Sequence, residues 1–453
     1  MGFLNKLRAK RRRRVVVIGL DGTPYSFVQR VVAEGRMPNF ARLLKEGSFQ
    51  RINSVYPTVS SVAWSSYMTG TNPAKHGIFG FIDRVPGSYK TTIPTSRLMQ
   101  RETLWEILSR AGKRVIVINV PVTYPPRPVN GILVSGFLSP RIEKAVFPPE
   151  KVALFKELGY IIDADPWAAR QSKEKAFAEV NAALEARTRT LLHLMDHEEW
   201  DFLQCHVMET DRLFHFTWEL MEKNDPVYAP RFYEVIEKID HMLGEVARRL
   251  DDRTTLIVMS DHGFCTLKYE VYVNHWLHQK GWLQLPDPRP ERVTLANVAE
   301  GTRVYSLDPG RVFINLKGRE PQGTVQPGRE YEALRDEVAA AAMEELRDPE
   351  TGEPMLEKVL RREEIYHGPL LERAADLILV PRDGYDLKGP FNKDTLTFKG
   401  DELIGMHTYP DAMVYIRGRK MQTDSFSVID VMPTVLALLD VPAPPDLDGR
   451  PLL

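Results

Sequence analysis

The most restrictive feature of the sequence is a set of three short apolar runs that each lead into an acidic residue. The runs span residues 15–20, 202–207 and 255–259, and the acidic residues that follow them are Asp21, Asp211 and Asp261. Continuous runs rich in branched residues are typical of strands buried on both faces of a parallel sheet. The carboxyl ends of such strands meet at one edge, where open α/β sheets bind ligands. We therefore expect the three aspartates to form one polar centre.

The segments between these runs alternate between helical and strand patterns. Helices are predicted at 172–197, 232–250 and 330–346, and further strands at 114–120, 132–137, 377–381 and 412–416. This alternation predicts an α/β fold with a mostly parallel central sheet flanked by helices. A chain of 453 residues with 43% hydrophobic content can bury a large core.

Histidines accompany the predicted acidic centre. His215 lies four residues after Asp211, so the two share a face if the segment is helical. His262 directly follows Asp261, and His407 precedes the strand at 412–416. Imidazole and carboxylate together suit Zn²⁺, or Mn²⁺ as the alternative, better than Mg²⁺ or Ca²⁺, which prefer oxygen ligands throughout.

Composition divides the chain into a core, an insertion and a tail. Residues 266–370 are irregular and rich in proline and glycine, which predicts a cap inserted between a first core segment, 15–265, and a last one, 371–453. Residues 1–14 form a basic tail, for which we expect either a solvated segment or a weak contact with an anionic membrane surface. The run 15–20 is too short for an export signal or a membrane span, so we expect a cytoplasmic protein, peripheral to the membrane at most.

Charge and cysteine content argue against a nucleic-acid-binding protein and against a disulfide-rich protein. Sixty basic and sixty-one acidic residues give a net charge of −1, which argues against a sequence-specific nucleic acid partner. The two cysteines, Cys205 and Cys265, lie in or beside apolar runs, and we expect small buried residues rather than a disulfide framework.

Hydroxyl groups cluster in residues 56–78, where a proline-bounded turn leads into a segment of small residues. A hydroxyl at a helix start lies among backbone N–H groups that have no helical partner, so it can act as a nucleophile beside an anion site or simply as a cap. Thr58, Ser60 and Ser61 all compete for this position.

At this point the chain resembles the alkaline phosphatase superfamily, most closely its type I phosphodiesterase/nucleotide pyrophosphatase branch. The motifs that carry the resemblance are GLDG at 19–22, PTVSSVAWSSYMTG at 57–70, KHGI at 75–78, TDRLFH at 210–215, SDHGF at 260–264, GMH at 405–407 and the closing segment from 428. The resemblance implies a three-layer sandwich with a cap and a metal-dependent hydrolase of phosphate esters. A small-molecule phosphate ester is the partner it implies.

The resemblance also implies roles for the candidate residues. Asp21, Asp261, His262 and the nucleophile would hold one divalent ion, and Asp211, His215 and His407 the other. The family's nucleophile lies ten residues before the glycine of the Thr-Gly pair, which gives Ser60, with Thr58 as the alternative. The implied reaction is an in-line displacement in two steps through a phosphoserine.

Two departures from the motifs of related enzymes narrow the range of expected substrates. Nucleotide pyrophosphatases carry asparagine three residues after the nucleophile, where this chain has Ala63, and the sulfatase Cys- or Ser-x-Pro-x-Arg motif is absent from this window. A phosphomonoesterase, phosphomutase or phosphotransferase on the same scaffold is therefore kept as an alternative, and a non-catalytic binding relative as a more distant one. Asn119, Asn315 and Arg319 are predicted substrate contacts, whereas His76 and His206 are predicted structural residues. The sequence leaves the oligomeric state open.

Overall fold

The computed structural model describes residues 13–288, 290, 292–422 and 426–453. Most of the predicted basic tail lies outside these residues. Arg14, which we assigned to the tail, instead begins the first strand. Its Nη2 lies 3.2 Å from Asp251 Oδ2, and its Cζ lies 4.6 Å from the centroid of the Trp200 ring. No helix in the described part of the chain is long and apolar enough to cross a membrane.

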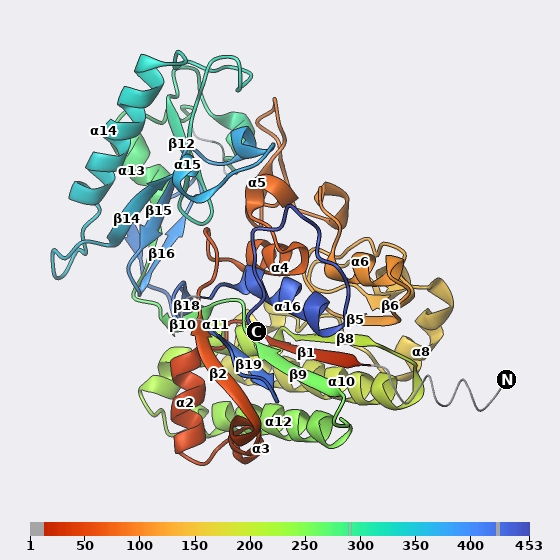
Figure 1. Ribbon diagram of the computed structural model, residues 1–453. Coiled ribbons are helices and arrows are strands. Elements are labelled where there is room, and N and C mark those ends of the chain that lie inside the picture. Colours follow the sequence, from red (N-terminus) through yellow and green to blue (C-terminus); the bar gives the residue numbers. More distant parts are fainter. Residues whose placement is uncertain (1–12, 289, 291, 423–425) are drawn as a thin grey trace.

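An eight-stranded sheet forms the centre of the larger part of the molecule (Figure 1). Its order is β2 (Gly47–Ile52), β19 (Ala412–Arg417), β9 (Thr254–Met259), β1 (Arg14–Leu20), β8 (Phe202–Val207), β5 (Val115–Ile118), β6 (Gly131–Val134) and β7 (Val146–Phe147). The five strands from β9 to β6 are parallel, and β19 and β7 pair antiparallel. The mostly parallel sheet expected from the sequence is thus confirmed.

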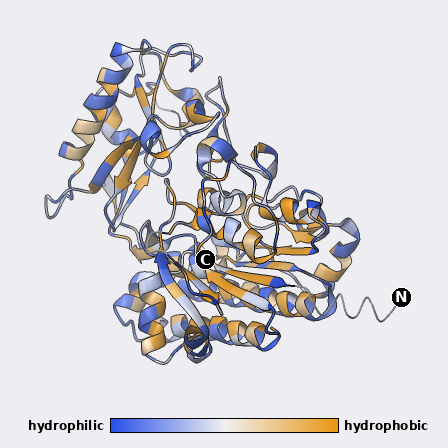
Figure 2. Cartoon of the chain, viewed as in Figure 1, coloured by the Kyte–Doolittle hydropathy of each residue, from blue (hydrophilic) through white to orange (hydrophobic). Residues whose placement is uncertain are grey.

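Helices cover both faces of this sheet because the side chains of β1 alternate between two cores. Val16 and Ile18 pack with one set of helices, and Val15 and Val17 pack with the other. The first set is α2 (Tyr25–Ala33), α3 (Pro38–Leu43), α8 (Val152–Glu157), α10 (Lys173–His197), α11 (Glu209–Glu222) and α12 (Tyr228–Arg248). The second set is α4 (Ser60–Thr69), α6 (Leu104–Arg110) and α16 (Val431–Leu438). Figure 2 shows the apolar colouring concentrated along the central strands between these layers.

A second, smaller body lies beyond the carboxyl ends of the central strands (Figure 1). Its four-stranded sheet has the order β12 (Val304–Leu307), β13 (Arg311–Ile314), β15 (Leu377–Pro381) and β14 (Leu356–Arg361). It shares one hydrophobic core with α13 (Val273–Gln279), α14 (Arg329–Glu345) and the strands β11 (Tyr269–Tyr272) and β16 (Tyr385–Lys388). We expected residues 377–381 to resume the main sheet, and that expectation is wrong because β15 pairs with β13 and β14.

A buried arginine connects the smaller body, which we call the cap, to the larger body, which we call the core. Arg311 in β13 donates from Nη1 to Asp83 Oδ1 at 2.7 Å and from Nη2 to the Ile82 carbonyl at 2.6 Å. Asp83 begins β3 (Asp83–Arg84), the strand that follows α5 (Pro73–His76), and Ile82 directly precedes it. β10 (Gly263–Thr266) and β18 (Gly405–Thr408) form a two-stranded sheet at the junction of the two bodies (Figure 1).

Candidate metal centre and active site

The sheet topology brings the predicted site residues together from distant parts of the sequence. Asp21 follows β1, and Asp261 and His262 follow the neighbouring strand β9. β8, on the other side of β1, leads into α11, which carries Asp211 and His215. The register of β10 and β18 sets His407 opposite Phe264, just beyond His262. The carboxyl ends of three adjacent strands therefore surround one centre, as the acidic run ends predicted.

The first group consists of Asp21, Asp261 and His262, with ligand atoms within 4.8 Å of one another. His262 Nε2 lies 3.5 Å from Asp21 Oδ1 and 3.4 Å from Asp261 Oδ2. The hydroxyl of Ser60 completes this group, with Oγ 3.2 Å from Asp21 Oδ1 and 3.3 Å from His262 Nε2. All four side chains are buried.

The electrostatics of the first group favour a bound cation. Asp261 Oδ2 is buried and has no hydrogen-bond partner among the described residues. Burial, followed by the charge of Asp21, raises the pKa of Asp261 well above its usual value. Burial, followed by the charge of His407, lowers the pKa of His262 to about 3, so its ring is neutral near pH 7. An unpaired carboxylate oxygen beside a neutral imidazole is a donor set that fits a divalent ion.

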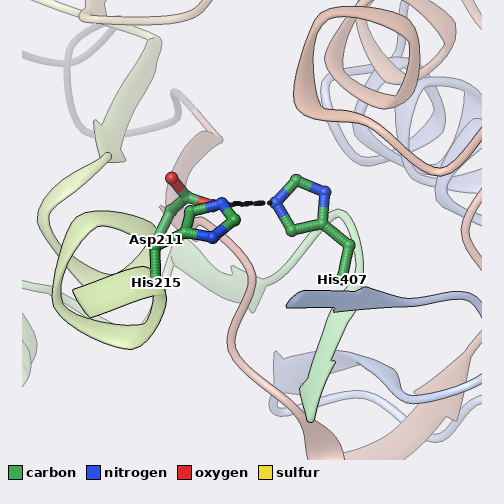
Figure 3. A group of neighbouring side chains, drawn as sticks. All are labelled: Asp211, His215 and His407. Carbon is green, nitrogen blue, oxygen red and sulfur yellow. Dashed lines mark hydrogen bonds and ion pairs between the residues drawn. The ribbon is translucent and has the colours of Figure 1, made fainter. Parts of the chain in front are cut away.

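The second group consists of Asp211, His215 and His407 (Figure 3). The two Nε2 atoms lie 2.9 Å apart, and Asp211 Oδ1 lies 3.3 Å from His215 Nε2 and 3.1 Å from His407 Nε2. On the far side of each ring, His215 Nδ1 faces the Gly405 carbonyl at 2.9 Å, and His407 Nδ1 faces the Thr58 carbonyl at 3.2 Å. Because a carbonyl can only accept, both Nδ1 atoms carry a proton, and each ring presents its Nε2 to Asp211. This arrangement is typical of histidines that bind a metal and are oriented by a backbone acceptor.

The two groups adjoin. The rings of His262 and His407 stack with centroids 3.7 Å apart, so one residue of each group contacts the other. A hollow of about 150 Å³ opens beside them, lined by Ser60, Phe81, Phe137, Met208, Asp211, Arg212, His215 and His407. We call it the Ser60 hollow. It provides space for a phosphoryl group within reach of the hydroxyl and of both candidate ion sites.

The second oxygen of Asp21 is held by two residues whose role the sequence did not reveal. Trp64 Nε1 donates to Asp21 Oδ2 at 2.9 Å, and His206 Nε2 donates to the same oxygen at 2.8 Å. Only Oδ1 is left to face Ser60 and His262. We predicted His206 to be a structural residue, and it orients Asp21 together with Trp64. A signal was present in Gly19, because a Cβ there would lie 2.4 Å from the Trp64 ring.

The competing hydroxyl groups have different neighbours. Ser60 is the first residue of α4, whose N-terminus has no side-chain cap. Thr58 Oγ1 donates to the Val55 carbonyl at 3.1 Å, and Ser61 Oγ donates to the Gly80 carbonyl at 2.8 Å. Of the three, Ser60 is the one whose hydroxyl contacts the first group.

The predicted substrate contacts lie elsewhere or have other partners. Arg319 makes a two-pronged ion pair with Asp376 inside the cap, at 2.6 and 2.7 Å. Asn315 donates to the carbonyls of Thr302 and Gln322 and accepts from Tyr89. Asn119 is fully buried beyond β5, where it accepts from the Tyr160 hydroxyl. None of the three lines the Ser60 hollow.

Comparison with known proteins identifies the family. A model of the type I phosphodiesterase / nucleotide pyrophosphatase family matches residues 15–410. The chain belongs to this family. A search of curated proteins by sequence found no significant match. Membership agrees with the alkaline phosphatase superfamily resemblance and indicates a phosphoester hydrolase of the phosphodiesterase/pyrophosphatase type.

Solved structures agree on the fold of this family member. Phosphonoacetate hydrolase from Sinorhizobium meliloti 1021, in complex with phosphonoacetate, superposes with a TM-score of 0.65 at 18% identity, covering 94% of this chain and 96% of that chain. An inactive variant of murine ectonucleotide pyrophosphatase/phosphodiesterase 5 in complex with AMP gives 0.57 at 17% identity, covering 96% of both chains. The human protein of the same name gives 0.57 at 15% identity, covering 97% of both. At these identities the similarity establishes the fold, which is alkaline phosphatase-like.

Proposed function

We propose that the chain hydrolyses phosphate esters with Ser60 as nucleophile and a divalent ion at each of the two groups, Zn²⁺ in preference to Mn²⁺. The observation that carries this proposal is the position of Ser60 Oγ, 3.2 Å from Asp21 Oδ1 at the uncapped start of α4. Thr58 remains the alternative nucleophile. The ligands proposed are Asp21, Ser60, Asp261 and His262 for the first ion and Asp211, His215 and His407 for the second.

The donor chemistry supports two divalent ions. Three carboxylates and a serine alkoxide carry four negative charges, which two divalent cations balance. When bound, the ions lower the pKa of the serine hydroxyl and stabilise negative charge on the reacting oxygens. The chain itself fixes the geometry, because Trp64 and His206 restrain Asp21 while the Gly405 and Thr58 carbonyls restrain the two histidines of the second group.

The proposed reaction proceeds by two displacements at phosphorus. Ser60 Oγ releases its proton to solvent and forms a bond to phosphorus as the bond to the departing alcohol oxygen breaks, and that oxygen takes up a proton from solvent. Water then forms a new bond to phosphorus and releases a proton to solvent, while the bond to Ser60 Oγ breaks and Oγ takes up a proton from solvent. The first N–H groups of α4 lie beside the phosphoryl oxygens in both steps and offset their charge.

A second cavity offers space for the organic part of the ester. It has a volume of about 210 Å³ and lies between core and cap, beside His215 and His407. Its walls are largely apolar and include Phe81, Ile82 and Tyr409 from the core and β15 from the cap. An ester group that leaves the Ser60 hollow in this direction would contact cap residues, so we propose that the cap sets the choice of substrate.

The direct test replaces Ser60 by alanine. In the metal-loaded protein, S60A should lose turnover of aryl phosphate monoesters, aryl diesters, nucleotide diesters and phosphonoacetate while keeping its metal content, measured by plasma emission spectrometry. S61A is the matched control, because its hydroxyl lies on the same helix turn and donates to the Gly80 carbonyl rather than to the first group. Full activity in S60A together with loss in Thr58→Val would transfer the nucleophile to Thr58.

A further inference from the structure

Arg212 is a charged residue of the Ser60 hollow that the proposed chemistry does not use. It follows Asp211 on α11 and lines the hollow together with Ser60. Its side chain is only 14% exposed. A guanidinium does not lose its proton in proteins, so Arg212 is a permanent cation.

The guanidinium is held in one orientation. Its Nε lies 3.2 Å from Asp163 Oδ1 and its Nη2 lies 2.6 Å from Asp163 Oδ2, a two-point contact that fixes the plane of the group. The ring of Phe137 lies against it, with the centroid 4.8 Å from Cζ. Holding the group in advance reduces the entropy that binding an anion would cost.

One edge of this group is left available. Nη1 lies 3.6 Å from Asp211 Oδ2, beyond hydrogen-bond distance, and within the described residues it has no hydrogen-bond acceptor. Asp163 occupies the Nε and Nη2 edge, so the remaining N–H groups are directed to the side that does not face Asp163. Because Arg212 and Ser60 line the same small hollow, a phosphoryl group attached to or approaching Ser60 lies within reach of that free edge.

The charge of the substrate determines what this edge contributes. A monoester dianion presents three non-bridging oxygens and two negative charges, whereas a diester presents two such oxygens and one charge and places an esterified oxygen at the third position. A guanidinium pairs with the extra anionic oxygen by a charge-assisted hydrogen bond, which an esterified oxygen cannot match. Phe137 and Phe81 also line this hollow.

We propose that Arg212, oriented by Asp163, binds a non-bridging phosphoryl oxygen and makes this family member selective for terminal phosphate monoesters over diesters. This inference rests on the proposed function and specifies its substrate class.

The test compares two substrates with the same leaving group, 4-nitrophenyl phosphate and methyl 4-nitrophenyl phosphate. The wild-type protein should favour the monoester in kcat/KM. In Arg212→Met, which keeps the apolar stem against Phe137, the ratio of monoester to diester kcat/KM should fall about 100-fold, the usual effect of losing one donor to a transition-state oxygen. Arg212→Lys should recover part of the ratio, and Asp163→Asn should lower it by a smaller factor.

Controls separate selectivity from structure and from the proposed function. Arg249→Met removes an arginine that is likewise paired with both oxygens of an aspartate, Asp196, but directly follows the end of α12 and does not line the hollow, so the ratio should not change. Equal losses on both substrates in Arg212→Met, or a wild-type preference for the diester, would overturn the proposal. If no ester is hydrolysed, the proposed function fails, and Arg212 is then judged by inorganic phosphate binding to the metal-loaded protein, which Arg212→Met should weaken at least tenfold.

Discussion

Replacing His206 by leucine tests how the structure prepares Asp21 for a metal ion. His206 Nε2 is one of two donors to Asp21 Oδ2, at 2.8 Å, and its Nδ1 is buried without a partner in the described structure. The ring therefore contributes a single hydrogen bond to a carboxylate. Such a bond is worth roughly 1.5 to 3 kcal/mol, equivalent to a factor of roughly 10 to 150 in a dissociation constant.

A second estimate agrees with this range, because replacing residues that orient metal ligands usually weakens metal affinity by roughly 10 to 100-fold. We therefore expect His206→Leu to weaken the ion at the first group by about 30-fold. The second group should keep its affinity within a factor of about three, since its three ligands are oriented by the Gly405 and Thr58 carbonyls rather than by His206.

The assay is zinc titration of chelator-stripped protein by competition with a chromophoric chelator. Wild type should show two tight sites, and His206→Leu one tight and one weakened site. His206→Gln supplies an amide donor and should recover part of the loss, whereas a purely packing role predicts no such recovery. Unchanged affinity for both ions in a folded His206→Leu protein would refute the reasoning that the imidazole orients Asp21.

Three further predictions concern pH, the cap and metal removal. Burial lowers the pKa of His76 to about 3, so the unfolded chain binds a proton that the folded chain does not. The free energy of unfolding should thus fall by about 1.4 kcal/mol per pH unit as pH drops from 6.5 towards 3. In urea denaturation at a series of pH values, the slope of this free energy against pH should be smaller by the same amount in His76→Asn. Asp376→Ala strands Arg319 and should cost about 3 to 5 kcal/mol in urea denaturation without changing KM, whereas a raised KM with unchanged stability would restore Arg319 as a substrate contact. A chelator should lower the melting temperature and zinc at 100 times its Kd should return about 2.7 kcal/mol; a melting temperature insensitive to both would contradict two structured ion sites.

The aspartates that follow the apolar runs could be predicted because the carboxyl ends of parallel strands lie at one edge of a sheet. Each of the strands β1, β8 and β9 is an apolar run, and parallel neighbours must end at the same edge, so Asp21 and Asp261 follow from this pattern, and Asp211 follows from its four-residue spacing to His215. His407 does not, because it reaches the centre through the pairing of β10 with β18, which no local periodicity reveals. It was found by resemblance.

The residues that orient these ligands could not be predicted for a related reason. β8 is buried at every position, so His206 stands in a strand whose two faces look alike in the sequence. Its partner is 185 residues away. β15 illustrates the same limit, since an apolar run predicts a buried strand without specifying which sheet it joins. Arg212 was overlooked because the motif at 210–215 was interpreted only through its two candidate metal ligands, Asp211 and His215.

The position of β19 has a consequence for how the chain assembles during synthesis. This late strand lies between β2 and β9 and is the partner of β2 in the main sheet. A nascent chain that has emerged only as far as His262 contains every proposed ligand of the first ion, yet it exposes the unpaired edges of β2 and β9 until residues 412–417 appear. Unpaired edges readily join other chains. The proposed ligands of the first ion are therefore synthesised well before β19 can pair with β2 and β9. Truncated chains that end before β19 should be prone to aggregate.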